Sequence, residues 1–434
     1  MKRYKNPSKN KWRDLCQRPL VQLDTIQSTV KKVFDEVEKH GDKAVKQYTQ
    51  QFDGVALGAI EVTQDEIKLA SDKISNELKN AIDLAKSNIT KFHRVQRNNK
   101  TQVITTTQGV DCWLEHRPIE KVGIYIPGGS APLFSTVMML AIPAIMAGCQ
   151  EVVLCSPPDQ YGNLSDVILY TAQCCDIHKI YKVGGIQAIA SMALGTETVP
   201  KVDKIFGPGN QYVTAAKQYL QHYQVAIDLP AGPSEVLVIA DQSANPVFVA
   251  SDLLAQAEHG HDSQVVLLSD DMDFIENVFE KVKKQTQHLH RKDIIEKSLK
   301  NGMTIHFPDL NDAIEFSNIY APEHLIIATE NADYLCQKIT NAGSVFIGPY
   351  SPESIGDYAS GTNHTLPTNG WARQCSGVTV QSFQKTISFQ KISEKGLYHI
   401  GPSVELLADA EGLDAHKNAV SVRLDHMKSK NLIS

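Results

Sequence analysis

The run Gln256-Ala-Glu-His-Gly260 combines residue types that can hold a metal ion. If this run ends a helix, Asp252, Gln256 and His259 lie on one polar stripe. The adjacent apolar stripe is formed by Val249, Ala250, Leu253, Leu254 and Ala257. An amide oxygen and an imidazole nitrogen one turn apart can bind the same cation. Glutamine is a poor zinc ligand, however, so an isolated Gln-x-x-His is more typical of a half-exposed helix. Residues elsewhere must decide between these interpretations.

Acids paired with histidines form three further candidate sets. They are Glu323 with His324, Asp357 with His364, and Glu411 with His416. An adjacent carboxylate and imidazole can divide proton transfer, with the imidazole as base near neutral pH and the carboxylate activating water. Glu323 and His324 stand where a predicted helix gives way to a strand, and element ends often carry function. A Glu-His dipeptide is also common on protein surfaces, so the pair does not prove a site.

The eight cysteines raise the option of a thiol nucleophile. They form no Cys-x-x-Cys pair, which argues against a zinc ribbon and a thioredoxin-like site. Cys149 and Cys155 flank a predicted strand, but nothing in the sequence supplies an activating base beside them. Small apolar core residues are the favoured interpretation.

Composition limits the class of protein. The chain has 434 residues, 42% hydrophobic and 21% charged, which suits a globular protein of two or three domains. Its net charge of -6 gives no basic field, so nucleic acid is not an expected partner. The basic residues 1–18 are not followed by the apolar core of a signal peptide, and the apolar run 137–148 is too short to cross a bilayer. We expect a cytoplasmic protein that does not bind a membrane.

The elements that must position these residues alternate along most of the chain. Residues 29–48 and 64–95 have helical spacing, and residues 101–113 predict a hairpin. Strands are predicted at 123–126, 151–155, 179–183, 202–206 and 225–228, with helices at 136–147, 165–174, 186–194 and 211–223. A second set has strands at 235–240, 264–269, 303–307, 325–329 and 344–347, with helices at 246–259, 273–286, 310–319 and 332–339. Such alternation predicts two parallel sheets with a cleft between them. Residues 348–377 predict a long binding loop, and the tail from 402 is helical.

Glycine-rich turns follow several strands of the first set. They are Pro127-Gly-Gly-Ser130, Gly184-Gly-Ile-Gln187 and Gly207-Pro-Gly-Asn210. Gly207-x-Gly209 before a helix, with Asp228 nineteen residues beyond Gly209, nearly matches a dinucleotide fingerprint, but Tyr212 replaces the third glycine. These turns favour a nucleotide-like ligand and simple tight turns about equally.

Seven stretches, in order over most of the chain, resemble the L-histidinol dehydrogenase family. They are Gly123-Ile-Tyr-Ile-Pro-Gly-Gly-Ser-Ala-Pro-Leu-Phe-Ser-Thr136, Val202-Asp-Lys-Ile-Phe-Gly-Pro-Gly-Asn210, Pro230-Ala-Gly-Pro-Ser-Glu-Val236, Gln256-Ala-Glu-His-Gly260, Ala321-Pro-Glu-His-Leu325, Gly356-Asp-Tyr-Ala-Ser-Gly-Thr-Asn-His364 and Ala415-His-Lys-Asn-Ala419. The family consists of zinc- and NAD-dependent homodimers that make histidine from histidinol.

The resemblance assigns roles by position. It implies a zinc site of Gln256, His259, Asp357 and His416, with His416 from the partner subunit. It implies Glu323 and His324 as the catalytic pair. Together with His324 and the zinc ligands, the residues implied to bind the substrate are Ser234, His364 and Glu411. Those implied to bind NAD are Tyr125, Gln187 and Asn210.

The resemblance also implies an architecture. We expect an α/β fold with two Rossmann-like parallel-sheet domains facing a cleft, a helical N-terminal region and a C-terminal dimerisation tail. The expected divisions are an arm at 1–25, a substrate and zinc domain at 26–120 and 236–380, an NAD domain at 121–235, and a helical tail at 381–434 that reaches the partner subunit.

The implied reaction oxidises histidinol twice. Zinc would act as a template that fixes the substrate, His324 would remove the hydroxyl proton, and Glu323 would activate water that adds to histidinal. Each oxidation would reduce one NAD. His261 stands where many family members have proline, and we expect it to be a bystander.

Two other classes of protein remain as alternatives. A hydrolase could use the same metal residues to activate water, without any response to NAD. A non-catalytic binding protein could be built from two α/β lobes, although binding alone does not need Glu323 and His324 together.

Overall fold

A computed structural model describes residues 1–18, 23–97, 101–128, 132–230 and 232–429. The chain divides into two compact units. Unit 1 comprises Met1–Arg97 and Ile119–Phe383, and unit 2 comprises Asn98–Pro118 and Gln384–Ser434. Among the described residues, no helix combines the length and apolar composition that a membrane crossing requires.

The first sheet of unit 1 has five parallel strands in the order β6-β5-β4-β7-β8. The strands are β4 (Lys121–Tyr125), β5 (Glu151–Cys155), β6 (Lys179–Tyr181), β7 (Lys204–Phe206) and β8 (Ala226–Ile227). All five were expected. They form because short apolar runs lie between turn residues, which suits strands buried on both faces.

Helices cover both faces of this five-stranded sheet. One apolar core joins it to α3 (Gln64–Lys73), α4 (Asn76–Arg94), α5 (Phe134–Ala147) and α6 (Asp166–Cys174). The other joins it to α2 (Leu23–Asp53), α7 (Gly185–Leu194) and α8 (Gln211–Tyr219). Residues 26–97 therefore pack on the sheet that was expected to belong to the NAD domain, whereas we had grouped residues 26–120 with the second sheet.

The second sheet has six parallel strands in the order β1-β11-β10-β9-β12-β13. They are β1 (Lys2–Lys5), β9 (Glu235–Ala240), β10 (Gln264–Ser269), β11 (Met303–His306), β12 (His324–Ala328) and β13 (Ser344–Ile347). The edge strand β1 was not expected, because its four residues are basic and polar with no apolar alternation. It pairs in parallel with β11 at the outer edge.

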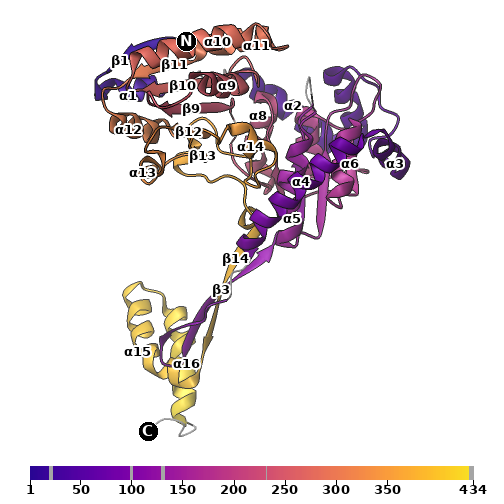
Figure 1. Cartoon of the computed structure of the whole chain (residues 1–434). Coiled ribbons are helices and arrows are strands. Elements are labelled where there is room, and N and C mark those ends of the chain that lie inside the picture. Colours follow the sequence, from indigo (N-terminus) through magenta and orange to yellow (C-terminus); the bar gives the residue numbers. More distant parts are fainter. Residues whose placement is uncertain (19–22, 98–100, 129–131, 231, 430–434) are drawn as a thin grey trace. The chain divides into compact units, whose positions relative to one another are not determined.

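Two helical layers enclose this six-stranded sheet, as Figure 1 shows. One layer is α9 (Pro246–Ala257), α10 (Met272–Thr286) and α11 (Lys292–Asn301). The other is α1 (Trp12–Leu15), α12 (Leu310–Tyr320) and α13 (Ala332–Cys336). The expected α/β class with two parallel sheets is therefore confirmed.

Several helices differ from the helices that were expected. The single helix expected at 64–95 is two, because Ser75 caps the start of α4 through a hydrogen bond from the Leu78 N–H. Helix α2 contains a kink at Gly41. Inside the loop expected at 348–377 lies a short helix, α14 (Glu353–Tyr358). The 3-10 helices are η1 (Lys9–Lys11), η2 (Val95–Arg97), η3 (Leu220–Tyr223), η4 (Trp371–Arg373) and η5 (Val380–Phe383).

Unit 2 has an antiparallel sheet in the order β14-β3-β2 and two packed helices. The elements are β2 (Ile104–Thr107), β3 (Val110–Pro118), β14 (Gln384–Ile392), α15 (Glu394–Ala410) and α16 (Asp414–Ser429). The hairpin was expected, but the tail from 381 was expected to be helical throughout. Strand β14 corrects this, because its residues pair with the whole length of β3.

Candidate active site

The expected catalytic pair lies at the amino end of two central strands of the six-stranded sheet. His324 is the first residue of β12, Glu323 precedes it, and Glu235 is the first residue of the neighbouring strand β9. Ligands of open parallel sheets usually bind at the carboxyl ends of strands. The candidate site therefore lies at the opposite, amino ends of the strands of this sheet.

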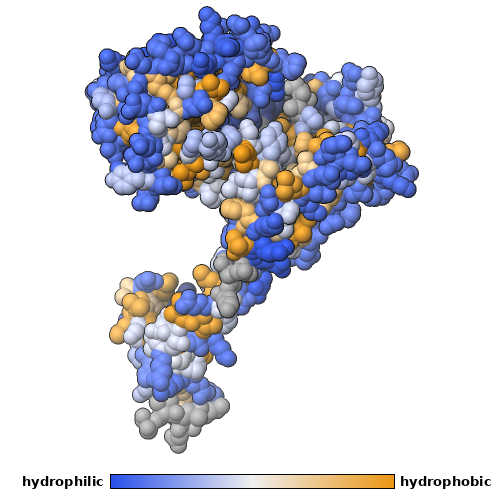
Figure 2. All heavy atoms as spheres, viewed as in Figure 1, coloured by the Kyte–Doolittle hydropathy of each residue, from blue (hydrophilic) through white to orange (hydrophobic). Residues whose placement is uncertain are grey.

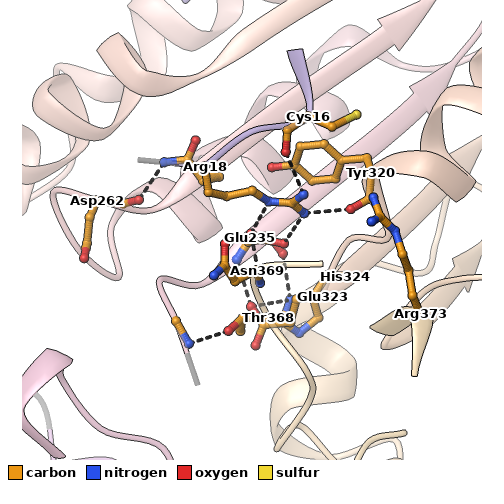
Figure 3. A network of polar contacts seen from close by, with 12 residues as sticks. Cys16, Arg18, Glu235, Asp262, Tyr320, Glu323, His324, Thr368, Asn369 and Arg373 are labelled. Carbon is orange, nitrogen blue, oxygen red and sulfur yellow. Dashed lines mark hydrogen bonds and ion pairs between the residues drawn. The ribbon is translucent and has the colours of Figure 1, made fainter. Parts of the chain in front are cut away.

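The backbone of one residue, Glu235, contacts both members of the pair, as Figure 3 shows. The Glu235 N–H donates to Glu323 Oε2 over 2.8 Å, and His324 Nδ1 lies 3.1 Å from the Glu235 carbonyl oxygen. If Nδ1 donates to that carbonyl, Nε2 is left to accept or release a proton. His324 Nε2 lies 3.4 Å from Asp357 Oδ1.

A group of acidic and imidazole side chains that could hold a cation lies beside this pair. Ligand atoms of His259, Glu353 and Asp357 all lie within 4.8 Å of one another. Helix α14, which carries Glu353 and Asp357, packs against α9. The structure therefore brings together two of the four expected metal residues, His259 and Asp357, and adds Glu353.

The burial and the missing hydrogen bonds of the Gln256 side chain indicate that it belongs to the same site. It is fully buried, and its amide oxygen and nitrogen have no hydrogen-bond partner within the part of the chain that the structure describes. We had expected His259 to lie on the helix at 246–259. Helix α9 ends at Ala257, so His259 lies just beyond the helix. Orphaned amide atoms at a helix carboxyl end, where the backbone is partly negative, suit a bound cation.

The charges of these side chains also favour a cation. Burial raises the pKa of Glu353 well above its ordinary value, and of Asp252 to about 7. Burial raises the pKa of Glu323 to about 8, against the opposing effect of the His324 imidazole. Several buried carboxyl groups in one place are costly to ionise without a positive partner. A divalent cation with nitrogen and oxygen ligands fits this donor set.

His324 is the positive group that the protein itself supplies. Burial lowers its pKa, but the carboxylates of Glu353 and Glu323 and the hydrogen bond with Asp357 outweigh this and raise the pKa to about 10. The same contact with His324 lowers the pKa of Asp357 despite its burial. The imidazole therefore favours its charged form wherever these carboxyl groups are ionised.

His364 joins this group to the five-stranded sheet. Its Nδ1 lies 2.8 Å from the Asp357 carbonyl oxygen, and its Nε2 lies 3.1 Å from Thr136 Oγ1. Thr136 is in the first turn of α5, which follows the carboxyl end of β4. Burial lowers the pKa of His364, which favours the neutral imidazole. His364 thus links the group around Asp357, at the amino ends of the six-stranded sheet, to the carboxyl ends of the five-stranded sheet.

The expected NAD residues lie at that carboxyl edge. Tyr125 ends β4, and its hydroxyl oxygen accepts a hydrogen bond from the Gly185 N–H at the start of α7. Gln187 is fully buried, donates to Asp53 Oδ2 over 3.1 Å, and keeps its Oε1 without a partner among the described residues. Asn210 caps α8. The orphaned amide oxygen can accept a hydrogen bond from a hydroxyl or amide group of a ligand, and helix starts suit its phosphate groups.

The near-match to a dinucleotide fingerprint has a structural explanation. Asp228 Oδ2 accepts from the Gly207 N–H over 2.7 Å, and its Oδ1 pairs with the buried Lys217. Lys217 also donates to the Gly207 carbonyl oxygen. Asp228 therefore braces the turn, so the fingerprint does not describe its role. Residues 129 and 130 of the first glycine-rich turn lie outside the described residues.

The remaining expected site residues fall into two groups. Ser234 immediately precedes β9, next to the peptide that contacts Glu323 and His324. Glu411 and His416 are exposed residues of unit 2, at the end of α15 and within α16, and their part in the site stays a prediction. His261 is exposed and does not belong to the group around Asp357.

The thiol alternative loses its physical basis. Burial raises the pKa of Cys149 to about 11 and raises that of the fully buried Cys155 further. Both thiols therefore stay protonated at neutral pH, and a protonated thiol is a poor nucleophile.

Comparison with known proteins identifies the family. A family model described as histidinol dehydrogenase matches residues 16–424 of this chain. The chain is 55% identical over 428 residues to histidinol dehydrogenase from Bacteroides thetaiotaomicron, covering 99% of this chain and 100% of that one. It is 50% identical over 421 residues to histidinol dehydrogenase from Escherichia coli strain K12, covering 96% of each. A crystal structure of histidinol dehydrogenase from Elizabethkingia anophelis matches with a TM-score of 0.96 and 55% identity over 99% of each chain.

This chain belongs to the histidinol dehydrogenase family. The resemblance that the seven sequence stretches indicated is therefore confirmed. Sequence reasoning nevertheless missed two residues of this family member's site, Glu353 and Glu235. Glu353 stands four residues before Asp357, and helical spacing within residues 353–358 was the signal that could have revealed it.

Proposed function

We propose that this histidinol dehydrogenase family member oxidises L-histidinol to L-histidine through bound L-histidinal, with zinc and two molecules of NAD. The observation that carries the proposal is the buried pair Glu323 and His324 beside the cation-binding group of His259, Glu353 and Asp357. Both oxidations remove hydrogen from the same carbon, so one acid–base pair can serve both. Membership of this family favours a dehydrogenase over a hydrolase or a non-catalytic binding protein.

Gln256, His259 and Asp357 would hold zinc, together with the partner subunit's His416. When bound, zinc supplies a fixed positive charge to which the imidazole and amine of histidinol can attach. The orphaned amide of Gln256 and the surplus of buried carboxyl groups support this assignment. Glu353 lies close enough to Asp357 and His259 to take part.

His324 would remove the hydroxyl proton of histidinol in the first oxidation. A base must be neutral, and the raised pKa of His324 depends on the carboxylates around it. Compensation of those carboxylates by a cation lowers the pKa toward the range in which imidazole acts as a base. The contact between Nδ1 and the Glu235 carbonyl fixes the ring, with Nε2 facing Asp357.

Glu323 would orient and deprotonate the water that adds to histidinal. Its Oε2 is occupied by the Glu235 N–H, which leaves Oε1 for that water. Ser234, His364 and Glu411 would contact the rest of the substrate. Binding of histidinal beside the buried side chains of Glu323 and His324 would keep the reactive aldehyde away from solvent between the two oxidations.

NAD would accept hydride at the carboxyl edge of the five-stranded sheet, near Tyr125, Gln187 and Asn210. The unsatisfied Oε1 of Gln187 and the starts of α7 and α8 support this position. We propose a cytoplasmic enzyme.

The proposed homodimer would place the tail of one subunit at the site of the other. Unit 2 exposes many apolar side chains for its size, which Figure 2 shows as orange atoms. They include Ile104, Leu114, Ile387, Ile392, Leu406, Leu407 and Val422. A surface of this kind is typical of a protein–protein contact.

A stoichiometric assay tests the proposal. The purified protein with zinc, histidinol and NAD should form two NADH per histidinol consumed, with histidine as product. A chelator should abolish NADH formation, and added zinc should restore it. Consumption of histidinol without NADH would indicate the hydrolase alternative, and binding without consumption would indicate a binding protein.

A further inference from the structure

A buried ion pair lies directly behind the catalytic residues, between Arg18 and Glu235 (Figure 3). The two side chains are 7% and 0% exposed. Arg18 Nε donates to Glu235 Oε1 over 2.8 Å, and Nη2 donates to Oε2 over 2.9 Å. This two-point contact fixes the carboxylate in orientation as well as position.

The rest of the Arg18 guanidinium is also engaged. Nη2 donates to the Tyr320 carbonyl oxygen, Nη1 donates to the Cys16 carbonyl oxygen, and the guanidinium carbon lies 3.6 Å from the centre of the Tyr320 ring. Tyr320 ends α12, three residues before Glu323. Arg18 therefore connects the start of β9 with the segment that leads into the catalytic pair.

The Glu235 residue receives a third contact from a distant segment. The Asn369 N–H donates to Glu235 Oε1 over 3.1 Å. The side chain of Glu235 is thus fixed from two sides, and its peptide in turn contacts Glu323 through N–H and His324 through the carbonyl. Three segments that are far apart in the sequence converge on one residue.

We propose that Arg18 and the Glu235 side chain are positioning residues that hold the Glu235 backbone N–H and carbonyl group in place for Glu323 and His324. The roles of Glu323 and His324 rest on the proposed function. Replacing a buried ion pair by apolar residues is often neutral for stability, so stability alone does not explain the pair. A fixed peptide does explain it, because displacement of a catalytic group by about 1 Å can cost 100-fold in rate.

Arg3 offers a matched control in the same terminal segment. It also pairs with a glutamate, Glu276, and lies over an aromatic ring, that of Phe279, but its side chain is 53% exposed. The test compares Arg18→Met with Arg3→Met for kcat, KM, zinc content and histidinol affinity. We expect Arg18→Met to lower kcat about 100-fold in both oxidations, with zinc content and histidinol affinity within about twofold of the parent chain. Arg3→Met should leave all four quantities unchanged.

Two further variants separate positioning from a general loss of structure. Arg18→Lys keeps the charge but loses the two-point contact, so we expect a kcat loss of about 10-fold. In the double variant Arg18→Met with Glu235→Gln, no buried charge is left uncompensated, and thermal stability should recover while kcat stays low. Recovery of kcat together with stability would overturn the proposal and leave the pair a purely structural one.

Hydrogen exchange gives a readout that does not depend on the reaction. The Glu235 amide should exchange faster in Arg18→Met than in Arg3→Met, because its acceptor, Glu323 Oε2, is no longer aligned. Unchanged exchange with unchanged kcat would overturn the proposal. A parent chain that forms no NADH from histidinol would refute the proposed function instead. The exchange rates of the Glu235 amide in Arg18→Met and Arg3→Met would still test whether Arg18 positions the Glu235 backbone.

Discussion

The chemistry of single side chains in this protein depends on neighbours that compensate their charge. His324 is buried among carboxyl groups, and its pKa follows their charge rather than its own burial. The pKa of Glu323 follows its burial instead, because burial raises it and the His324 imidazole only limits the increase. Removing one member therefore changes the protonation of the others.

For the single residue His324, we predict that His324→Asn slows both oxidations while substrate and metal still bind. Loss of a proton-transfer group typically costs 100- to 10,000-fold, so kcat should fall by about that factor. Steady-state kinetics with histidinol and with histidinal, and metal analysis of the variant, measure this. His261→Asn is the control, because His261 is exposed and apart from the group around Asp357. Near-normal turnover in His324→Asn would refute the base role.

The sequence indicated some site residues and could not indicate others. Gln256, His259 and the Glu323–His324 pair are visible because their types and spacing suggest chemistry before any fold is known. Glu235 is not visible, because its backbone acts on the pair and a backbone contact has no residue-type signature. Glu353 was hidden because the polar, glycine-rich composition of residues 348–377 predicted a loop.

Among the elements, the turn after β7 leaves no room for a side chain at Gly207. Gly207 has a φ of 125°, and a β-carbon there would lie 2.2 Å from the Tyr125 carbonyl oxygen. We predict that Gly207→Ala destabilises the protein by about 2–4 kcal/mol and raises the KM for NAD. Gly54→Ala is the control, since Gly54 also has a positive φ, of 76°, but no atom within 4 Å among the described residues. Thermal unfolding and NAD titrations compare the two, and equal effects would contradict the steric explanation.

The end of helix α2 provides a pH-dependent contact. Burial raises the pKa of Asp53 from 3.8 to about 6, against the opposing hydrogen bond from Gln187. The folded state thus binds the proton more tightly, and this contribution to stability is present below pH 3.8 and lost as the pH rises through about 6. Because Asp53 is partly exposed, the loss should be about 1 kcal/mol.

We therefore predict that Asp53→Asn is more stable than the parent chain at pH 7.5 and loses this advantage near pH 4. Unfolding in urea at both pH values, with the metal removed, measures the difference. A difference that does not change with pH would show that Asp53 has an ordinary pKa.

The alternation of strands and helices followed from the sequence because buried parallel strands are short apolar runs between turn residues. Other features did not follow from the sequence. Strands β1 and β14 are polar and depend on pairing with β11 and β3, which only the tertiary structure supplies. The packing of α2 to α4 on the five-stranded sheet is a choice between two apolar surfaces, and helical spacing does not distinguish them.

For the whole molecule, the proposed shared site makes a prediction about mixed subunits. His416→Ala and Glu323→Gln should each be nearly inactive. In a heterodimer, one site would combine the intact pocket of one subunit with the intact tail of the other. Random exchange gives half heterodimers with one working site in two, so about a quarter of the parent activity should return. Proven subunit exchange without recovery would show that His416 acts within its own subunit or not at all.

The placement of the proposed catalytic pair at the amino end of β12 has a practical consequence. A strand of five residues spans about 15 Å, so the turns at the opposite rim of the six-stranded sheet are remote from the chemistry. The turn after β9 contains the exposed residues Gln242 and Ser243. It is a suitable place to attach a fluorescent label or to graft a peptide, and Gln242→Cys would carry such a reporter while substrate turnover continues.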